Sequence, residues 1–187
     1  MEANKIKICG IKDLSIANFC IESDADYLGF VSYKNSPRDI SFNDSKNIIS
    51  KLSKPVNTVA VTVNADISNI KEIEDSGFNH IQLHGSESLD YLSSIKKSTK
   101  LKIIKAFGIS TQNDFDHIGD YIDLCDFFLL DAKPAKSEMP GGNAKKFDWG
   151  LLRDHNLGRK FFLSGGLDMG NLEIALKNNI TSFFDVS

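Results

Sequence analysis

The chain has 187 residues, 41% of them hydrophobic, which suits one globular domain spanning residues 1–187. Its formal net charge of −3 and its dispersed basic residues give no footprint of nucleic-acid binding, and no apolar run reaches membrane-spanning length. Three cysteines without close pairing and a polar N-terminus predict reduced thiols in the cytoplasm, and the four scattered histidines show no metal-ligand spacing.

Short apolar runs alternate with helical-period segments through the first half of the chain. We expect strands at 6–9, 27–32, 57–63 and 80–83. Helices are expected at 12–23, from Ser41 to Leu52, from Asp66 to Gly77, and around 89–95. Ser41 and Asp44 have capping-box spacing, and Asp66 and Gly77 are typical of a helix start and a helix end.

The second half of the chain repeats this alternation. Strands are expected at 101–106, 124–130, 160–164 and 181–186, and short helices at 111–118, 148–153 and 171–177. Eight near-continuous apolar strands favour a (β/α)8 TIM barrel over a doubly wound open sheet, which usually has fewer strands. At roughly 23 residues per unit the barrel is compact and lacks the last helix.

In a parallel barrel the strand ends share one mouth, and two residues there can transfer protons. Cys9 ends the first expected strand and Asp131 directly follows the sixth. A partly exposed thiolate can act as a general base, and a partly desolvated carboxyl can act as a general acid. The structural alternatives are a small buried hydrophobe at Cys9 and a loop cap at Asp131.

Binding groups are predicted at the same mouth. Arg38 has a planar fork that suits a carboxylate, although a solvated surface arginine is the commoner case. His84 and Asp185 also follow or end strands, and His84 is equally compatible with a structural histidine. Two glycine pairs suit an anion, because backbone amides and a helix N-terminus beyond strand seven commonly bind phosphate in barrels: Gly141 with Gly142, and Gly165 with Gly166.

Taken together, these motifs resemble the phosphoribosylanthranilate isomerase family of tryptophan biosynthesis. The matching blocks span nearly the whole chain in the family's order: 7–11, 28–31 with 36–38, 61–64, 81–85, 130–131 with 141–142 and 147–149, 163–167, and 185–187. The resemblance implies a (β/α)8 barrel without metal or organic cofactor.

The resemblance also implies a reaction, the Amadori rearrangement of N-(5-phosphoribosyl)anthranilate to the carboxyphenylamino-deoxyribulose phosphate. It assigns Cys9 as general base, Asp131 as general acid and Arg38 as the binder of the anthranilate carboxylate. Both glycine pairs would hold the phosphate. The expected partner is this small phosphorylated substrate, and the expected state is a monomer or homodimer.

Three departures from the family pattern affect these expectations. Ala144 stands where glycine is common, Ser32 stands where an aromatic residue is frequent, and the family's last loop and helix are absent after Ser187. The chain is therefore also compatible with a phosphate-binding barrel without catalysis. A related barrel enzyme of tryptophan or histidine synthesis is disfavoured, because those enzymes use a Lys/Glu or paired Asp set.

Overall fold

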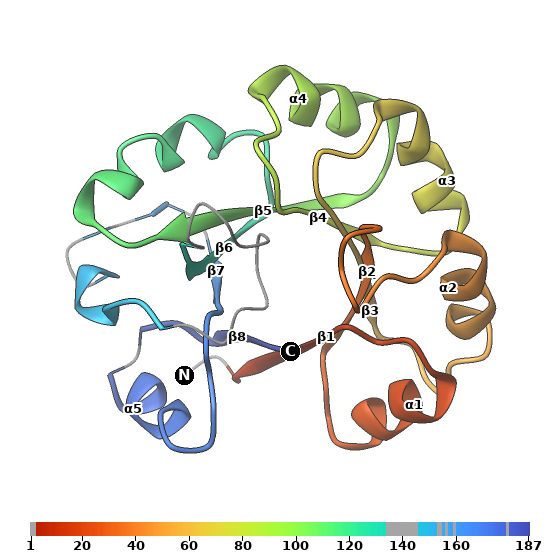
Figure 1. Cartoon of the computed structure of the whole chain (residues 1–187), viewed down its shortest axis with the longest axis horizontal. Coiled ribbons are helices and arrows are strands. Elements are labelled where there is room, and N and C mark those ends of the chain that lie inside the picture. The colour runs from red at the N-terminus through yellow and green to blue at the C-terminus, as the bar shows by residue number, and fades with distance from the viewer. Residues whose placement is uncertain (1–2, 134–145, 153–154, 156, 159, 179) are drawn as a thin grey trace.

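The computed structural model describes residues 3–133, 146–152, 155, 157–158, 160–178 and 180–187. Within them eight parallel strands form a closed barrel in the order β1 to β8, with β8 paired to β1 (Figure 1). The strands are β1 Lys5–Cys9, β2 Tyr27–Ser32, β3 Asn57–Thr62, β4 His80–Leu83, β5 Lys102–Ile109, β6 Phe127–Ala132, β7 Phe161–Leu163 and β8 Phe183–Val186. The predicted barrel is confirmed.

Helices surround the barrel between the strands (Figure 1). The α-helices among the described residues are α1 Leu14–Glu22, α2 Phe42–Ile49, α3 Ile70–Asp75, α4 Leu89–Ser98 and α5 Leu172–Lys177. The predicted caps form: Ser41 accepts a hydrogen bond from the Asp44 amide at 3.1 Å, and Asp66 accepts one from the Ser68 amide at 2.9 Å. None of the helices in these ranges is long and apolar enough to cross a membrane.

Two predicted helices differ in type. The segment expected as a helix at 111–118 contains two 3-10 turns, Gln112–Phe115 and Ile118–Tyr121, and the segment at 148–153 contains the 3-10 turn Trp149–Leu152. In the first of these turns Asp114 accepts hydrogen bonds from the amides of Ser110 and Thr111, so the chain tightens around one carboxylate. Short 3-10 pieces of this kind serve as connectors where there is no room for a longer helix.

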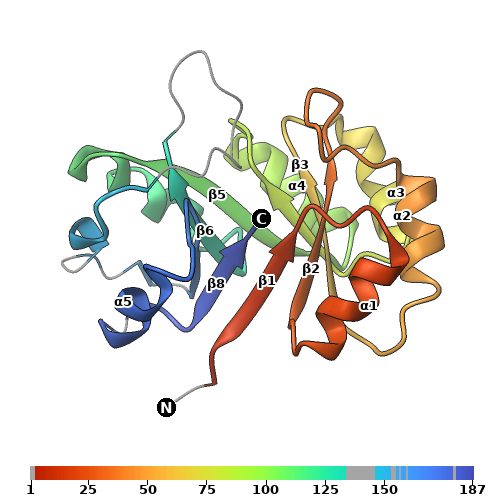
Figure 2. The same ribbon diagram turned by 60° about the horizontal axis from the view of Figure 1, so that its bottom comes forward.

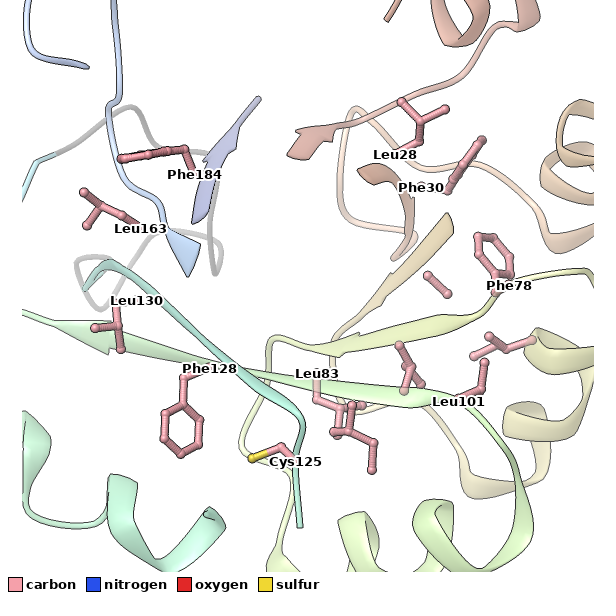
Figure 3. Close-up of a cluster of buried hydrophobic side chains, with 14 of the residues drawn as sticks. Leu28, Phe30, Phe78, Leu83, Leu101, Cys125, Phe128, Leu130, Leu163 and Phe184 are labelled. Carbon is pink, nitrogen blue, oxygen red and sulfur yellow. The ribbon is translucent and has the colours of Figure 1, made fainter. Parts of the chain in front are cut away.

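A large apolar cluster fills the space between the strands and the surrounding helices. Figure 3 shows part of it, with side chains that lie on the strands or immediately before them: Leu28, Phe30, Phe78, Leu83, Leu101, Cys125, Phe128, Leu130, Leu163 and Phe184. All of these are buried. Residues alternate along each strand, so this outer core takes every second residue and the remainder face the barrel axis.

The barrel interior is aromatic in its amino-terminal part. The Phe162 ring lies 5.1 Å from Tyr27 and 5.2 Å from Phe183, centroid to centroid, and Phe127 and His80 complete this group. We call these five residues the aromatic plug. Its rings meet edge to face or tilted, the arrangements that aromatic pairs prefer.

Apolar side chains are exposed on β1, which pairs with β8, and on α1. Within the described ranges no helix follows β8, as expected. Ile6 on β1 is 36% exposed, and Phe19 on α1 is 68% exposed. Figure 2 shows β1 and β8 side by side and pointing the same way, so the carboxyl ends of the first and last strands meet at one mouth.

Candidate active site

The predicted site residues in the described part of the chain all belong to the carboxyl ends of strands or to the loops that follow. Cys9 ends β1, Asp131 is the penultimate residue of β6, and Asp185 is the penultimate residue of β8. The remaining ones lie in loops: Arg38 after β2, His84 after β4, and Gly165 with Gly166 after β7. Parallel pairing around a closed barrel brings these ends to one rim.

Cys9 lies beside a buried ion pair that sequence reasoning did not identify. The Lys7 side chain is fully buried, and its Nζ lies 2.7 Å from Asp185 Oδ1. The other oxygen of Asp185 accepts a hydrogen bond from Ser164 Oγ at 3.2 Å. Lys7 and Cys9 are two residues apart on β1, so both point into the barrel. The alternation of side chains along a strand could have identified Lys7, because it places Lys7 on the same face as Cys9.

The ionisation of Cys9 reflects these neighbours. Burial raises the pKa of the thiol, the positive charge of Lys7 lowers it, and the negative charge of Asp185 raises it again; the net pKa lies above its ordinary value. Burial alone would lower the pKa of Lys7, but Asp185 and Cys9 outweigh it and the net shift is upward. Lys7 therefore remains an ammonium at neutral pH.

Asp131 faces His84 across the mouth. His84 Nε2 lies 3.6 Å from Asp131 Oδ2, and His84 Nδ1 lies 3.0 Å from the side-chain nitrogen of Gln82. With that amide donating, the His84 proton sits on Nε2 and points toward the carboxylate. The Asp131 carboxylate also accepts the Ala132 amide at 2.8 Å, and it is 6% exposed. This position suits exchange of a proton with a bound molecule.

A second buried ion pair supports the loop that carries His84. Lys105 Nζ lies 3.0 Å from Glu87 Oε2 and donates to the Gly85 carbonyl at 2.8 Å. Glu87 Oε1 accepts the Asn64 amide at 2.9 Å, so one carboxylate ties the loops after β3 and β4 to β5. Burial lowers the pKa of Lys105, partly offset by Glu87. Neither residue was identified from the sequence, because their contact is tertiary.

Arg38 packs against the start of the first loop. A Cβ added to Gly10 would lie 2.6 Å from Arg38 Cδ, and Gly10 has a φ of +96°. Glycine is needed there for both the conformation and the space. Among the residues that the structure describes, none forms an ion pair with the Arg38 guanidinium. Its fork is thus available to an anion.

Of the two predicted glycine pairs, Gly165 with Gly166 lies among the described residues. Gly141 and Gly142 lie outside the described residues. Gly165 and Gly166 both have positive φ, +87° and +62°, and the Gly166 carbonyl accepts a hydrogen bond from Asn171 at 2.8 Å. Such left-handed backbone is readily adopted only by glycine, and it turns consecutive amides toward one side, as anion-binding loops do.

Phe107 directly follows the strand expected at 101–106, which would place it at the mouth, but it lies elsewhere. β5 runs on to Ile109, so Phe107 falls within the strand and its ring packs 5.4 Å from Tyr121 and 5.5 Å from Phe128, toward the outer core. The described residues contain no group of three or more His, Cys, Asp or Glu side chains that could hold a metal ion. The groups that are present allow proton transfer and anion binding.

The whole chain was compared with known proteins. The family model described as N-(5'phosphoribosyl)anthranilate (PRA) isomerase matches residues 6–187. An N-(5'-phosphoribosyl)anthranilate isomerase of Agrobacterium fabrum is 39% identical over 184 residues, which cover 97% of this chain and 84% of that protein. The enzyme of the same name from Sinorhizobium medicae is 38% identical over 174 residues, covering 92% and 81%.

Solved structures agree with this match. The phosphoribosyl anthranilate isomerase of Thermotoga maritima superposes with a TM-score of 0.87 at 34% identity, covering 98% of this chain and 87% of that one. A phosphoribosyl anthranilate isomerase in complex with reduced 1-(o-carboxyphenylamino)-1-deoxyribulose 5-phosphate gives a TM-score of 0.85 at 33% identity, with the same coverage. By its sequence and its fold, the chain belongs to the N-(5'-phosphoribosyl)anthranilate isomerase family.

Proposed function

We propose that this protein is an isomerase of tryptophan biosynthesis that converts N-(5-phosphoribosyl)anthranilate to 1-(2-carboxyphenylamino)-1-deoxyribulose 5-phosphate. The observation that carries the proposal is the placement of Cys9 and Asp131 at the same rim of a closed barrel, at the ends of β1 and β6, in a chain of this family. The reaction moves protons without net oxidation, so an acid and a base suffice.

In the proposed mechanism Asp131 is the general acid and Cys9 is the general base. Asp131 protonates the oxygen of the furanose ring, the bond from C1 to that oxygen breaks, and the anthranilate nitrogen shares its electron pair with C1 to give a protonated Schiff base. Cys9 loses its proton to solvent at the mouth, and the thiolate then removes the proton from C2. The resulting enolamine takes up a proton at C1 and loses one from the C2 hydroxyl. His84, 3.6 Å from Asp131, helps to hold that carboxyl in place.

The remaining predicted residues hold the substrate. Arg38 binds the anthranilate carboxylate through its fork, and the Gly165–Gly166 loop, with its two positive φ values, binds the phosphate. Asp185 lines the same end of the barrel, where its carboxylate is 7% exposed. The Gly141–Gly142 loop belongs to the phosphate site in this proposal on the strength of its sequence alone.

The test is turnover of the phosphoribosyl anthranilate by the purified chain and two variants. Cys9→Ala and Asp131→Asn are each expected to lower kcat by about 10²-fold or more, because each removes one proton-transfer group. Thermal unfolding of the variants checks that the fold is retained. Near-normal rates in both variants would overturn the mechanism.

We also propose an alternative function, because a loop that suits a phosphate does not by itself require catalysis. The chain would then be a barrel that binds a phosphorylated ligand without catalysis. Calorimetry with a reduced product analogue separates the two functions, since binding without any turnover supports the second. We further propose a cytoplasmic protein, consistent with three cysteines that form no disulfide among the described residues, which is a monomer or a homodimer. Sedimentation measures that state.

A further inference from the structure

Two charged side chains, Lys7 and Asp185, meet inside the barrel beside the proposed base Cys9. The Lys7 ammonium lies 2.7 Å from Asp185 Oδ1, and its positive charge also acts on the Cys9 sulfur beside it. An ammonium has three donors and no acceptor, so it can serve a carboxylate and a thiolate at once. A fully buried lysine is costly to maintain, and Asp185 is the anionic partner that offsets this cost.

Gly29 on the neighbouring strand leaves the space for this meeting. The register pairs Cys9 with Gly29, and a Cβ added to Gly29 would lie 2.9 Å from Cys9 Sγ and 3.1 Å from Lys7 Nζ. Both atoms therefore lie over the same Cα. Gly29 does not have a positive φ, so the need for glycine here is a need for room.

We propose that Lys7 is a positioning residue that holds the Cys9 sulfur and stabilises its thiolate, that Asp185 opposes this effect, and that Gly29 keeps the contact open. The inference deepens the proposed function and rests on it for its catalytic meaning. Lys7 touches the base and its counter-ion rather than the reacting carbon, so its effect on the reaction passes through Cys9.

The opposite charges of Lys7 and Asp185 together set the ionisation of Cys9. A lone ammonium beside Cys9 would favour a permanent thiolate, and a lone carboxylate would prevent one. With both present the resting group is a thiol, and its pKa lies above the ordinary value. The Cys9 thiolate that removes the substrate proton is therefore a strong base, and the charge of Lys7 lowers the free energy needed to form it.

The experiment follows alkylation of Cys9 by iodoacetamide against pH, without substrate, using peptide mass mapping. The probe is neutral, so nearby charges do not attract it, and mapping separates Cys9 from the buried Cys20 and Cys125. At neutral pH Lys7→Met is expected to slow alkylation about tenfold or more, and Asp185→Asn is expected to speed it, because the two charges act in opposite directions. A merely structural pair would give changes of one sign.

Two further variants protect the test against misfolding. Lys7→Met leaves Asp185 buried without its partner, so Lys7→Met/Asp185→Asn removes both charges and restores neutrality. The double variant is expected to react more slowly than the original chain, since Lys7 has the larger effect on Cys9. Gly29→Ala is expected to slow alkylation as well, whereas the control Gly119→Ala, where an added Cβ meets nothing within 4 Å, leaves it unchanged.

The outcomes separate this inference from the proposed function. Opposite shifts in the single variants, with a slower double variant, support the inference whatever the turnover. Shifts of the same sign, or no shift in a folded double variant, overturn it. Opposite shifts in a chain whose turnover survives Cys9→Ala would leave the inference standing and remove the proposed base.

Discussion

The two ends of the barrel interior are built from different chemistry. The amino end holds the aromatic plug, whose rings pack edge to face or tilted around Phe162. The carboxyl end holds a buried ammonium, two buried carboxylates and a thiol: Lys7, Asp131, Asp185 and Cys9. One end gains free energy from apolar burial, and the other keeps charges that are costly to bury. The stability of the fold and its chemistry are thus separated along one axis.

The largest expected effect is the loss of a plug ring. Phe162→Ala removes a fully buried ring in contact with Tyr27, Phe127 and Phe183, and should lower the free energy of unfolding by about 3–5 kcal/mol. Urea unfolding measures this loss. Phe19→Ala, at a ring 68% exposed, is the control and should change stability by less than about 0.5 kcal/mol. A loss of activity per folded molecule in Phe162→Ala would contradict the separation of stability and catalysis between the two ends of the barrel.

The plug also predicts a pH dependence of stability. Burial lowers the pKa of His80 to about 4, and its Nε2 is buried without a hydrogen-bond partner in the described part of the protein. The folded state therefore favours neutral His80, and stability should fall as pH drops from about 6.5 through about 4, by roughly 3 kcal/mol.

Denaturant unfolding over this pH range measures the His80 effect. His80→Gln should flatten that part of the profile, because it removes the titrating group. His117→Gln is the control, since the His117 side chain is 88% exposed. A profile unchanged by His80→Gln would contradict the prediction.

A smaller effect is expected at the mouth. Arg38→Met removes the fork proposed to bind the anthranilate carboxylate, and KM should rise about 10- to 100-fold, the equivalent of a charged hydrogen bond or two. Steady-state kinetics measure this change. Lys34→Met, in the same loop and exposed, should leave KM unchanged. A fall in kcat with KM unaltered would instead give Arg38 a part in the chemical step.

The smallest effect lies on the outside, away from both ends. Ser88 caps α4 by accepting the Tyr91 amide at 3.2 Å, and Ser88→Ala should cost about 1 kcal/mol of stability. Ser94→Ala on the exposed face of the same helix should cost nothing measurable. Thermal melts compare the two. A drop in kcat/KM on Ser88→Ala would show that this helix cap also influences catalysis, through the loop between β4 and α4.

The sequence predicted the barrel because eight buried parallel strands read as eight apolar runs between helical segments. It predicted the place of Cys9 and Asp131 because strand ends can be read from such runs. It did not predict the ion pairs Lys7–Asp185 and Lys105–Glu87, since each joins residues far apart in sequence and lysine is rarely buried. The need for room at Gly29 depends likewise on the register between two strands.

The 3-10 conformation of the short connectors was also not predicted from the sequence. The segment 111–118 has helical composition, and only the gathering of amides around Asp114 decides that it forms 3-10 turns. Phe107 was misplaced because β5 continues three residues beyond its expected end. In the second case the pairing with β6, which reaches Ile109, fixed the boundary rather than local preference.

The pair Lys7–Asp185 has a consequence for biosynthesis, because its two members are separated by 178 positions along the chain. The ribosome adds Asp185 to the chain 178 residues after Lys7. Until β8 docks against β1, the lysine beneath the thiol has no carboxylate to accompany it into the interior. We therefore expect the charged site to form only when β8 closes the barrel, late in folding.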